Sequence, residues 1–324
     1  MKRIAIVTPG GDAPGMNATI RAVVRKALFN GLEVYGIMRG YAGLIENEFV
    51  KLDWKSVSGI MDRGGTFLKT ERYENFEDIK NISIGCNNLK KNKINGLVII
   101  GGDGSLHGGF AIHKFSGIGV VGIPASIDND IYGTDETVGY DTACNTAVSA
   151  IDKIKDTETS FERIFVVEVM GKKRGFIALK VGITIGAEAI VIPEVPFNRE
   201  NFANELIKGR KRGMRRAIVV YAEGVGKRHE FVEYLNKKTG FIVRESILGY
   251  IQRGGAPSFR SRMLASLFGA FSVDTLSKNP EKAKMVGIRD DKIVTCELET
   301  CILKKKEIDK SLLELQRSIS VFKL

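Results

Sequence analysis

The sequence predicts a doubly wound α/β protein with mainly parallel strands, and three observations indicate this fold class. Short apolar runs alternate with Gly-rich turns and helical stretches, as in other proteins of this class. Three of these runs end in glycines and aspartates, at the place where open α/β sheets bind ligands. The chain has 324 residues, which suffice for a sizeable core and about two domains.

Hydrophobic spacing defines the first three elements. Residues 4–8 form an apolar strand. A helix is expected from Met16, because apolar residues then recur at helical spacing until Gly31 provides a C-terminal stop. A second strand over 32–37 follows directly.

The alternation of strand, turn and helix continues along the rest of the chain. It recurs in the segments 97–114, 118–155 and 163–185. Two later strands, 189–192 and 217–221, flank a helical stretch over 201–211. No low-complexity linker separates these segments, so composition alone sets no domain boundary.

Glycines and aspartates follow three of the predicted strands. The turns are GGDAPG at 10–15, GGDGS at 101–105 and SIDND at 126–130. Glycine lets the backbone approach phosphate closely, and helix N-termini favour anions. Aspartates at the same edge repel phosphate unless a divalent cation lies between them. The combination predicts magnesium-dependent phosphoryl transfer.

The bulk composition favours anionic ligands and gives no sign of a membrane span. The formal net charge of +11 favours phosphate, nucleic acid or membrane surfaces without choosing among them. No apolar run reaches about 18 residues, and the first residues lead straight into a strand. We therefore expect a cytoplasmic protein with neither a membrane span nor a signal peptide.

The cysteines and the densest basic cluster point to no further ligand. The four cysteines lack a paired CxxC spacing, so we expect reduced thiols, with neither a zinc site nor a disulfide framework. They are Cys86, Cys144, Cys296 and Cys301. The basic cluster at 208–216 is either a solvated helix end or a nucleic-acid patch. No aromatic residue interleaves with its charges, so we expect no nucleic-acid partner.

Five motifs resemble those of the bacterial ATP-dependent 6-phosphofructokinase family of glycolysis. The motifs are GGDAPGMN, GGDGS, SIDND, VVEVMG and GYIQRGG, in the family's order and spacing. Several long motifs in fixed order are far more specific than a single glycine-rich loop. The similarity covers residues 1 to about 300, and the tail is less distinctive.

The resemblance implies two similar doubly wound α/β domains with mainly parallel sheets, assembled as a homotetramer. The first domain would bind ATP, and the second would bind fructose 6-phosphate. We place the nucleotide-binding domain at 1–140 plus 254–302. The sugar-phosphate-binding domain would comprise 141–253 plus 303–324.

Asp128 matches the family's general base, which takes the proton from the sugar's 1-hydroxyl during its attack on the γ-phosphate. In an extended segment Asp128 and Asp130 lie on the same side, since strand side chains alternate. From the residues alone, two turn aspartates that cap the next helix fit equally well. Asp130 matches a second acidic position, and Ser126 matches a substrate-binding threonine.

The turns of the first domain match the family's ATP site. Asp103 corresponds to the carboxylate that holds Mg²⁺, although alone it would be an ordinary turn residue in about half of such loops. No GxxxxGK[ST] motif is present, so this is not a Walker-type loop. The ATP-binding positions are Gly10, Gly11, Arg72, Tyr73, Gly102, Asp103, Gly104 and Ser105.

Arginines are suited to bind the sugar phosphate, because guanidinium offers planar, multivalent donors. Taken singly, each candidate arginine is more often a solvated surface residue. The resemblance implies that Arg163 and Arg244 come from a neighbouring subunit. Tyr250 and Lys172 stand where the family usually has histidine and arginine, which affects sugar-phosphate affinity more than reaction type. The substrate-binding positions are Ser126, Ile127, Asp128, Asp130, Arg163, Met170, Gly171, Lys172, Glu223, Arg244, Tyr250 and Arg253.

The resemblance also implies an allosteric pocket for ADP or phosphoenolpyruvate. Arg21 and Arg25 share one helix face at i, i+4 spacing. Trp54 and Met214 stand where the family usually has basic residues, so we expect weakened effector binding. The effector positions are Arg21, Arg25, Trp54, Lys155, Gly186, Glu188, Arg212, Met214, Arg215 and Arg216.

Two other functions compete with ATP-dependent phosphotransfer. Pyrophosphate-dependent relatives typically carry a second aspartate after GGD and a lysine before the TIDND-type segment. Gly104 and Ala125 occupy those positions and favour ATP. A non-catalytic nucleotide-sensing homologue is the second alternative, and the intact Asp103, Asp128 and Arg72 argue against it.

Overall fold

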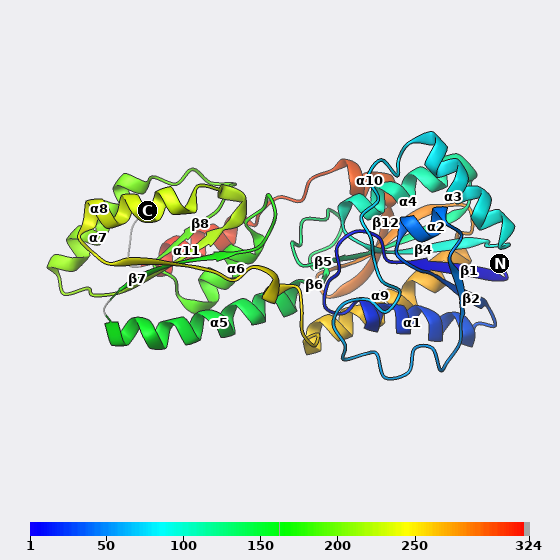
Figure 1. Cartoon of the computed structure of the whole chain (residues 1–324), viewed down its shortest axis with the longest axis horizontal. Helices are drawn as coiled ribbons and strands as arrows, with labels where there is room; N and C mark the ends of the chain where they lie inside the picture. The colour runs from blue at the N-terminus through cyan, green and yellow to red at the C-terminus, as the bar shows by residue number, and fades with distance from the viewer. Residues whose placement is uncertain (162, 321–324) are drawn as a thin grey trace. The chain divides into compact units, whose positions relative to one another are not determined.

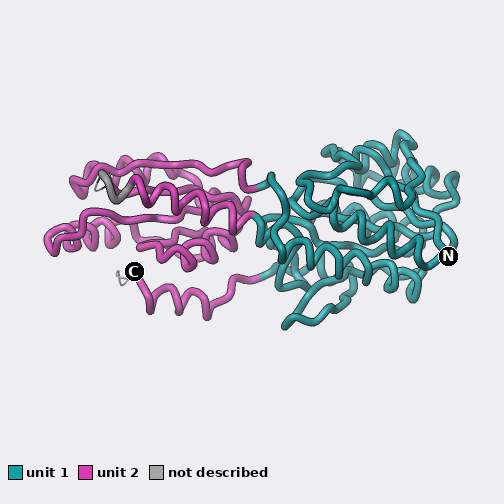
Figure 2. Tube along the Cα trace, turned by 90° about the horizontal axis from the view of Figure 1, so that it is seen from below, with its two compact units in different colours: residues 1–142, 253–306 teal, residues 143–252, 307–324 magenta. Residues whose placement is uncertain are grey.

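The computed structural model describes residues 1–161 and 163–320, and the chain divides into two compact units (Figures 1 and 2). Unit 1 comprises Met1–Thr142 and Arg253–Lys306, and unit 2 comprises Ala143–Gln252 and Glu307–Leu324. The chain therefore passes between the units three times, so neither unit is continuous in sequence.

Unit 1 is built on an eight-stranded sheet in the order β12-β11-β5-β4-β1-β2-β3, with β6 beside β5. Only the two edges are antiparallel, where β12 pairs with β11 and β3 pairs with β2. The strands are β1 (Arg3–Val7), β2 (Glu33–Ile37), β3 (Phe49–Leu52), β4 (Gly96–Gly101), β5 (Gly119–Ser126), β6 (Val138–Gly139), β11 (Ala283–Arg289) and β12 (Lys292–Glu297).

Helices cover both faces of this sheet (Figure 1). On one face α1 (Met16–Phe29) packs along α9 (Phe259–Lys278). The opposite face carries α2 (Tyr41–Ile45), α3 (Ile79–Lys91), α4 (Asp103–Ser116) and α10 (Leu298–Leu303). Gly31 follows α1 with φ of 75°, so it ends the helix in the conformation that glycine best adopts.

Unit 2 contains a four-stranded parallel sheet in the order β10-β7-β9-β8. Its strands are β7 (Ile164–Val169), β8 (Ala189–Val191), β9 (Ala217–Ala222) and β10 (Val243–Ile247). Its helices are α5 (Tyr140–Phe161), which begins in unit 1, α6 (Phe176–Ile185), α7 (Arg199–Lys211), α8 (Arg228–Thr239) and α11 (Lys310–Ile319). Phe202 of α7 and Phe231 of α8 fill the core on one face, and α6 packs Gly182 against Ile190 on the other.

The predicted fold class is confirmed, because both units contain mainly parallel sheets with helices on their faces. The elements expected from periodicity all occur, within a few residues of the predicted bounds. Five strands, β3, β6, β10, β11 and β12, were not predicted. Strands β3, β10, β11 and β12 each contain charged residues, which interrupt the apolar run, and β6 has only two residues.

The first crossing between the units is anchored within unit 1. The Thr142 hydroxyl lies 2.8 Å from Ser261 Oγ and accepts a hydrogen bond from the Ser258 N–H at 3.0 Å. Thr142 and Ser258 are 116 positions apart, so this contact joins the start and the end of the inserted segment.

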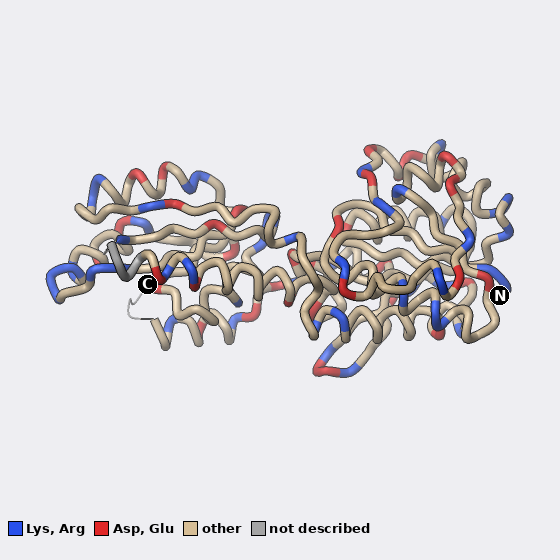
Figure 3. The backbone as a smooth tube through the Cα atoms, turned by 60° about the horizontal axis from the view of Figure 1, so that its bottom comes forward, with Lys and Arg blue, Asp and Glu red and all other residues tan. Residues whose placement is uncertain are grey.

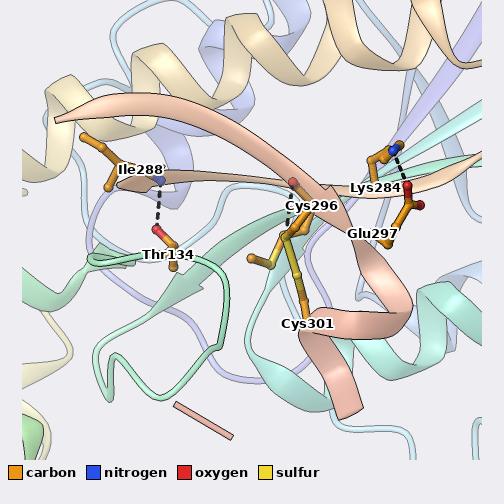
Figure 4. The surroundings of a disulfide bond; sticks show 7 residues. Thr134, Lys284, Ile288, Cys296, Glu297 and Cys301 are labelled. Atoms are coloured by element: carbon orange, nitrogen blue, oxygen red, sulfur yellow. Dashed lines mark hydrogen bonds and ion pairs between the residues drawn. A yellow bond between two sulfur atoms is a disulfide. The ribbon is translucent and has the colours of Figure 1, made fainter. Parts of the chain in front are cut away.

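The expectation of four reduced thiols was wrong for one pair. Cys296 of β12 and Cys301 of α10 form a disulfide, because α10 begins directly after β12 and folds Cys301 back under the strand (Figure 4). A Cβ at Gly133 would lie 2.8 Å from Cys296 Sγ and 2.9 Å from Cys301 Sγ. The next residue, Thr134, accepts the Ile288 N–H at 3.0 Å, so this loop lies against the disulfide and β11.

Charged residues of both signs are interspersed along both units (Figure 3). Within the described residues, no helix is long and apolar enough to cross a bilayer.

Candidate active site

The three glycine- and aspartate-rich turns meet at one sheet edge. Strands β5, β4 and β1 are consecutive neighbours and run parallel, so their carboxyl ends lie together. A Cβ at Gly101, the last residue of β4, would lie 3.0 Å from the Pro9 carbonyl oxygen. A Cβ at Gly102 would lie 3.8 Å from that of Ser126. The sequence-predicted nucleotide and acidic turns are thus brought together.

Gly10 is required by a close approach between the first two turns. Its φ is +82°, and a Cβ there would lie 3.0 Å from Ser105 Oγ. Ser105 is buried and donates its hydroxyl to the Pro9 carbonyl at 2.7 Å, while Thr70 donates to the Gly10 carbonyl at 2.6 Å. The Ser105 side chain therefore holds the turn in place.

Gly11 lies beneath Arg253 of the GYIQRGG motif. A Cβ on Gly11 would lie 2.9 Å from an Arg253 guanidinium nitrogen. Arg253 donates to Asp12 Oδ1 at 2.7 Å. A predicted sugar-phosphate ligand thus lies in unit 1, at the nucleotide turn, and Asp12 orients it. The sequence did not reveal this pair, because the two residues are 241 positions apart.

Asp103 begins α4 and is half-exposed, with 52% of its side chain accessible. Gly102 precedes it as the cap, and a Cβ on Gly104 would have nothing within 4 Å. The first N–H groups of a helix and its dipole favour anions, and carboxylate oxygen is the donor that Mg²⁺ prefers. The residues present therefore fit a magnesium-bound phosphate group.

Tyr73 connects to this turn through an aromatic cluster. Its ring lies edge-on to Phe76, at 6.4 Å between centroids, and Phe76 stacks on Tyr41 at 3.8 Å. Tyr41 donates its hydroxyl to the Ser105 carbonyl, and burial raises the pKa of its phenol. Arg72 beside Tyr73 is exposed. The cluster places the Arg72-Tyr73 pair in the same unit as the glycine turns.

The acidic segment follows β5, but the chain bends at residues 127 and 128, so the extended conformation that the prediction assumed ends at Ser126. Asp128 and Asp130 are half-buried, and Ile127 and Asn129 between them are buried. The Asp128 N–H donates to Ser126 Oγ at 3.2 Å, which leaves the Ser126 hydroxyl proton for another acceptor. With its side chain buried, Ile127 can offer a ligand only its backbone.

Asn129 and Thr137, which sequence reasoning missed, fix this segment. Asn129 has a left-handed φ of 53°, and its amide donates to the Asp135 carbonyl at 3.0 Å. The Thr137 N–H donates to Asn129 Oδ1 at 3.1 Å, and the Thr137 hydroxyl donates to the Ser126 carbonyl. Asparagine adopts the αL conformation more readily than most residues, so an asparagine at position 129 is a sequence signal for such a turn.

The second unit brings four predicted sugar ligands together at the carboxyl ends of β7 and β9. Glu223 Oε1 accepts the Gly171 N–H at 3.1 Å and also the Lys172 N–H. The Met170 N–H donates to Gln252 Oε1 at 3.3 Å, and Gln252 is fully buried. Gln252 therefore positions the loop, a role that sequence reasoning missed.

Arg163 and Arg244 do not join these four residues. They lie at the amino ends of the adjacent strands β7 and β10, where Arg244 is paired in register with Phe165. Met170 lies seven positions after Arg163, across β7, which corresponds to about 20 Å. Tyr250 lies in the 3₁₀ turn Gly249–Gln252 with 77% of its surface exposed.

The predicted effector residues are divided between the units. In unit 1 the Arg25 guanidinium lies 5.8 Å from the centre of the Trp54 ring. Burial and the neighbouring Arg25 lower the pKa of Arg21. At position 54, where the family usually has a basic residue, the indole of Trp54 thus makes a cation–π contact with Arg25.

The effector residues of unit 2 lie partly together. Lys155 donates to the Ile185 carbonyl just before Gly186, which ends α6 with φ of 66°. Glu188 accepts the Ile218 N–H at 2.7 Å, and burial raises the pKa of its carboxyl. Arg212, Arg215 and Arg216 are exposed. Met214 is partly buried and packs onto the core of unit 2.

This geometry defines an α/β protein with glycine- and aspartate-rich turns at the carboxyl edge of a parallel sheet, an arrangement suited to phosphate groups. A phosphofructokinase family model matches residues 3–276. The chain belongs to the phosphofructokinase family.

Relatives of this family match the whole chain. The ATP-dependent 6-phosphofructokinase of Listeria monocytogenes is 49% identical over 321 residues, which cover 99% of this chain and all of that protein. The enzyme of that name from Thermotoga neapolitana is 46% identical over 320 residues, with 99% and 100% covered.

Solved phosphofructokinases share the fold. The structure from Saccharomyces cerevisiae aligns with a TM-score of 0.88 and 32% identity over 98% of this chain, which spans about half (47%) of that chain. A pyrophosphate-dependent phosphofructokinase from Marinobacter aquaeolei aligns with a TM-score of 0.84 and 20% identity, covering 96% and 86% of the two chains. The latter likeness concerns the fold alone.

Proposed function

We propose that the protein transfers the γ-phosphoryl group of ATP to the 1-hydroxyl of fructose 6-phosphate. The products are fructose 1,6-bisphosphate and ADP, and the reaction is a committed step of glycolysis. The observation that carries this conclusion is 49% identity, over the full length, to an ATP-dependent 6-phosphofructokinase. No membrane-spanning helix occurs among the described residues, and we infer a cytoplasmic enzyme.

Asp128 is the general base in this proposal. Its carboxylate is half-buried at the edge that carries the glycine turns, and Ser126, Asn129 and Thr137 hold its backbone. A positioned carboxylate accepts the proton as the sugar hydroxyl attacks. Asp103 would hold Mg²⁺, which neutralises charge on the phosphates of ATP.

The donor is ATP and not pyrophosphate. A second aspartate at position 104 would fill the open space beside Asp103, but Gly104 leaves that space empty. Position 125 holds a buried alanine, whose methyl side chain carries no charge, so it offers no cation to the site.

The sugar-phosphate site is composite and needs a second copy of the chain. Arg163 and Arg244 lie at the amino ends of β7 and β10, about 20 Å from the Met170–Lys172 loop along β7. Since the described chain keeps these two groups apart within unit 2, a neighbouring subunit would supply the arginines. A homotetramer satisfies this requirement for every copy.

A coupled assay tests the function directly. Purified protein is given Mg²⁺ and fructose 6-phosphate with ATP or with pyrophosphate, and then ATP with other sugar phosphates. We expect turnover with ATP and fructose 6-phosphate at least about 10-fold above the other pairs. Preference for pyrophosphate, or no turnover with either donor, would overturn the proposal.

Regulation by ADP or phosphoenolpyruvate is weakened in this proposal. The indole of Trp54 and the core-packed side chain of Met214 supply no cation, and one charge-assisted contact to an anion contributes about 1.5–3 kcal/mol. We expect ADP to shift fructose 6-phosphate saturation little in the unmodified protein and more in Trp54→Arg. Strong activation by ADP that persists in Arg21→Ala would contradict the assignment of this pocket.

A further inference from the structure

His107 lies on α4, one turn after Asp103, and the family motifs do not explain it. Its Nε2 is 3.7 Å from Asp103 Oδ1. The two side chains are 35% and 52% exposed. Residues at i and i+4 share one face of a helix, so both side chains point to the same solvent-facing region.

We propose that His107 is a second protein ligand, beside Asp103, for the divalent ion that accompanies the nucleotide. The inference rests on the proposed function, since the ion arrives with the phosphates of ATP. It specifies the class of ion: a site with one imidazole nitrogen prefers Mn²⁺ or Co²⁺ to Mg²⁺ more strongly than a site of oxygen ligands alone.

The distance between the two side chains suits a shared ion. A carboxylate oxygen and an imidazole nitrogen, each about 2.1 Å from one ion and at right angles, lie about 3 Å apart. Rotation of two half-exposed side chains covers the remaining difference from 3.7 Å. A Cβ on Gly104 would meet nothing within 4 Å, so no protein atom occupies the space beside the intervening residue.

The pair alone cannot complete the coordination of an ion. Among the described residues, no three His, Cys, Asp or Glu side chains cluster in a way that would hold a metal. Phosphate oxygens and water would therefore supply the remaining ligands, as they do at many Mg²⁺ sites. Binding of the ion should consequently depend on nucleotide.

Only His107 among the histidines is placed for this role. The chain has three histidines. His113 Nδ1 faces the Ile118 carbonyl oxygen at 2.9 Å, and His229 of unit 2 pairs with Glu245 and Glu233. A histidine nitrogen coupled to a nucleotide-bound ion would therefore belong to His107.

Pulsed electron paramagnetic resonance of Mn²⁺ provides the test. The full-length protein is loaded with Mn²⁺ and a methylene-bridged, non-hydrolysable ATP analogue, and couplings to phosphorus and nitrogen are recorded. We expect both couplings in the unmodified protein. His107→Gln should keep the phosphorus coupling and lose the nitrogen coupling, and its preference for Mn²⁺ over Mg²⁺ in binding should fall about 10-fold. His113→Gln, on the same helix, should keep both couplings.

The outcomes separate this proposal from the function on which it rests. Phosphorus coupling without nitrogen coupling in the unmodified protein would show that His107 only pairs with Asp103, and the nucleotide site would stand. Nitrogen coupling that persists in His107→Gln would assign the ligand elsewhere and overturn the proposal. Absence of Mn²⁺ binding with the analogue would overturn both.

Discussion

At the scale of single residues, the proposed base depends on neighbours that carry no charge. Ser126 accepts the Asp128 N–H at 3.2 Å, and the Thr137 hydroxyl donates to the Ser126 carbonyl. Asn129, buried with a φ of 53°, bridges Asp135 and Thr137. These contacts fix the backbone on both sides of the carboxylate, so its orientation is set before substrate arrives.

Replacement of the base separates chemistry from binding. Asp128→Asn keeps the shape of the side chain but cannot accept the sugar's proton, so we expect turnover to fall about 10²–10⁴-fold. The Michaelis constant for fructose 6-phosphate should change about 3-fold or less. Steady-state kinetics measures both values, with Asp291→Asn, whose side chain is 83% exposed, as the control. Near-normal turnover would remove Asp128 from this role.

The parts of the site that could be predicted from sequence are those set by local geometry. Parallel strands end at one edge of a sheet, which brought the predicted glycine turns together. Contacts over long separations could not be predicted. The ion pair between Arg253 and Asp12 spans 241 positions, and the Ser105 hydroxyl donates to the carbonyl of Pro9, 96 positions away.

At the scale of elements, the loop between the acidic segment and α5 lies against the disulfide (Figure 4). Gly133 has φ of +97°, and an added Cβ would meet both sulfur atoms within 3 Å. Gly133→Ala should lower the free energy of unfolding by about 3 kcal/mol, from backbone strain and overpacking together. Gly117→Ala is the matched control, because its φ is +71° and nothing lies within 4 Å.

Chemical denaturation of both variants measures this difference. Gly117→Ala should cost only about 1 kcal/mol. Because the disulfide holds the two sulfur atoms in place, a reductant should shrink the gap between the variants. Equal destabilisation of the two variants would show that the space around Gly133 is unimportant.

A second prediction concerns the ion pairs that connect α8 to the sheet of unit 2. Arg228 is 15% exposed and donates to Glu168 on β7 at 2.6 Å and to Glu245 on β10 at 2.7 Å. Arg228→Leu leaves two carboxylates without this partner and should cost about 2–3 kcal/mol. Lys237→Leu on α8, where the side chain is 81% exposed and 4.0 Å from Glu233, should cost less than about 0.5 kcal/mol. Hydrogen exchange of the β7 and β10 amides measures both losses.

The same pair predicts a pH dependence. The hydrogen bond from Arg228 is the main cause that lowers the pKa of Glu245. A lowered pKa in the folded state gives stability that is present above the ordinary carboxyl range and is lost as pH falls through the folded value. The difference between the unmodified protein and Arg228→Leu should therefore narrow on acidification. A difference that widens at low pH would contradict this origin.

The strands that could be predicted consist mostly of apolar residues. Strands such as β4 are buried throughout and give continuous apolar runs. Strand β10 is exposed at three of its five residues, and the edge strand β12 begins and ends with charged residues. Their pairing depends on neighbouring strands and not on local hydrophobicity, so periodicity alone did not find them.

At the scale of the whole molecule, the composite site predicts complementation between inactive chains. Asp128→Asn lacks the base, and Arg244→Ala lacks an arginine that another subunit would supply. Mixing the two proteins under subunit exchange should restore part of the activity, because some mixed sites combine an intact base with an intact arginine. Native mass spectrometry shows whether mixed oligomers form. Inactive mixed oligomers would mean that each site lies within one chain.

Unit 1 is completed by residues that follow the inserted segment, as the contact between Thr142 and Ser258 illustrates, and this affects the order in which the units can form during synthesis. Strand β11 pairs with β5, and α9 packs along α1, so unit 1 lacks a central strand neighbour and a covering helix until residues 259–289 leave the ribosome. The four-stranded sheet of unit 2 needs nothing beyond residue 247. Unit 2 can therefore form its sheet on the ribosome while unit 1 is still incomplete. This order is the reverse of the usual one, in which the domain synthesised first folds first.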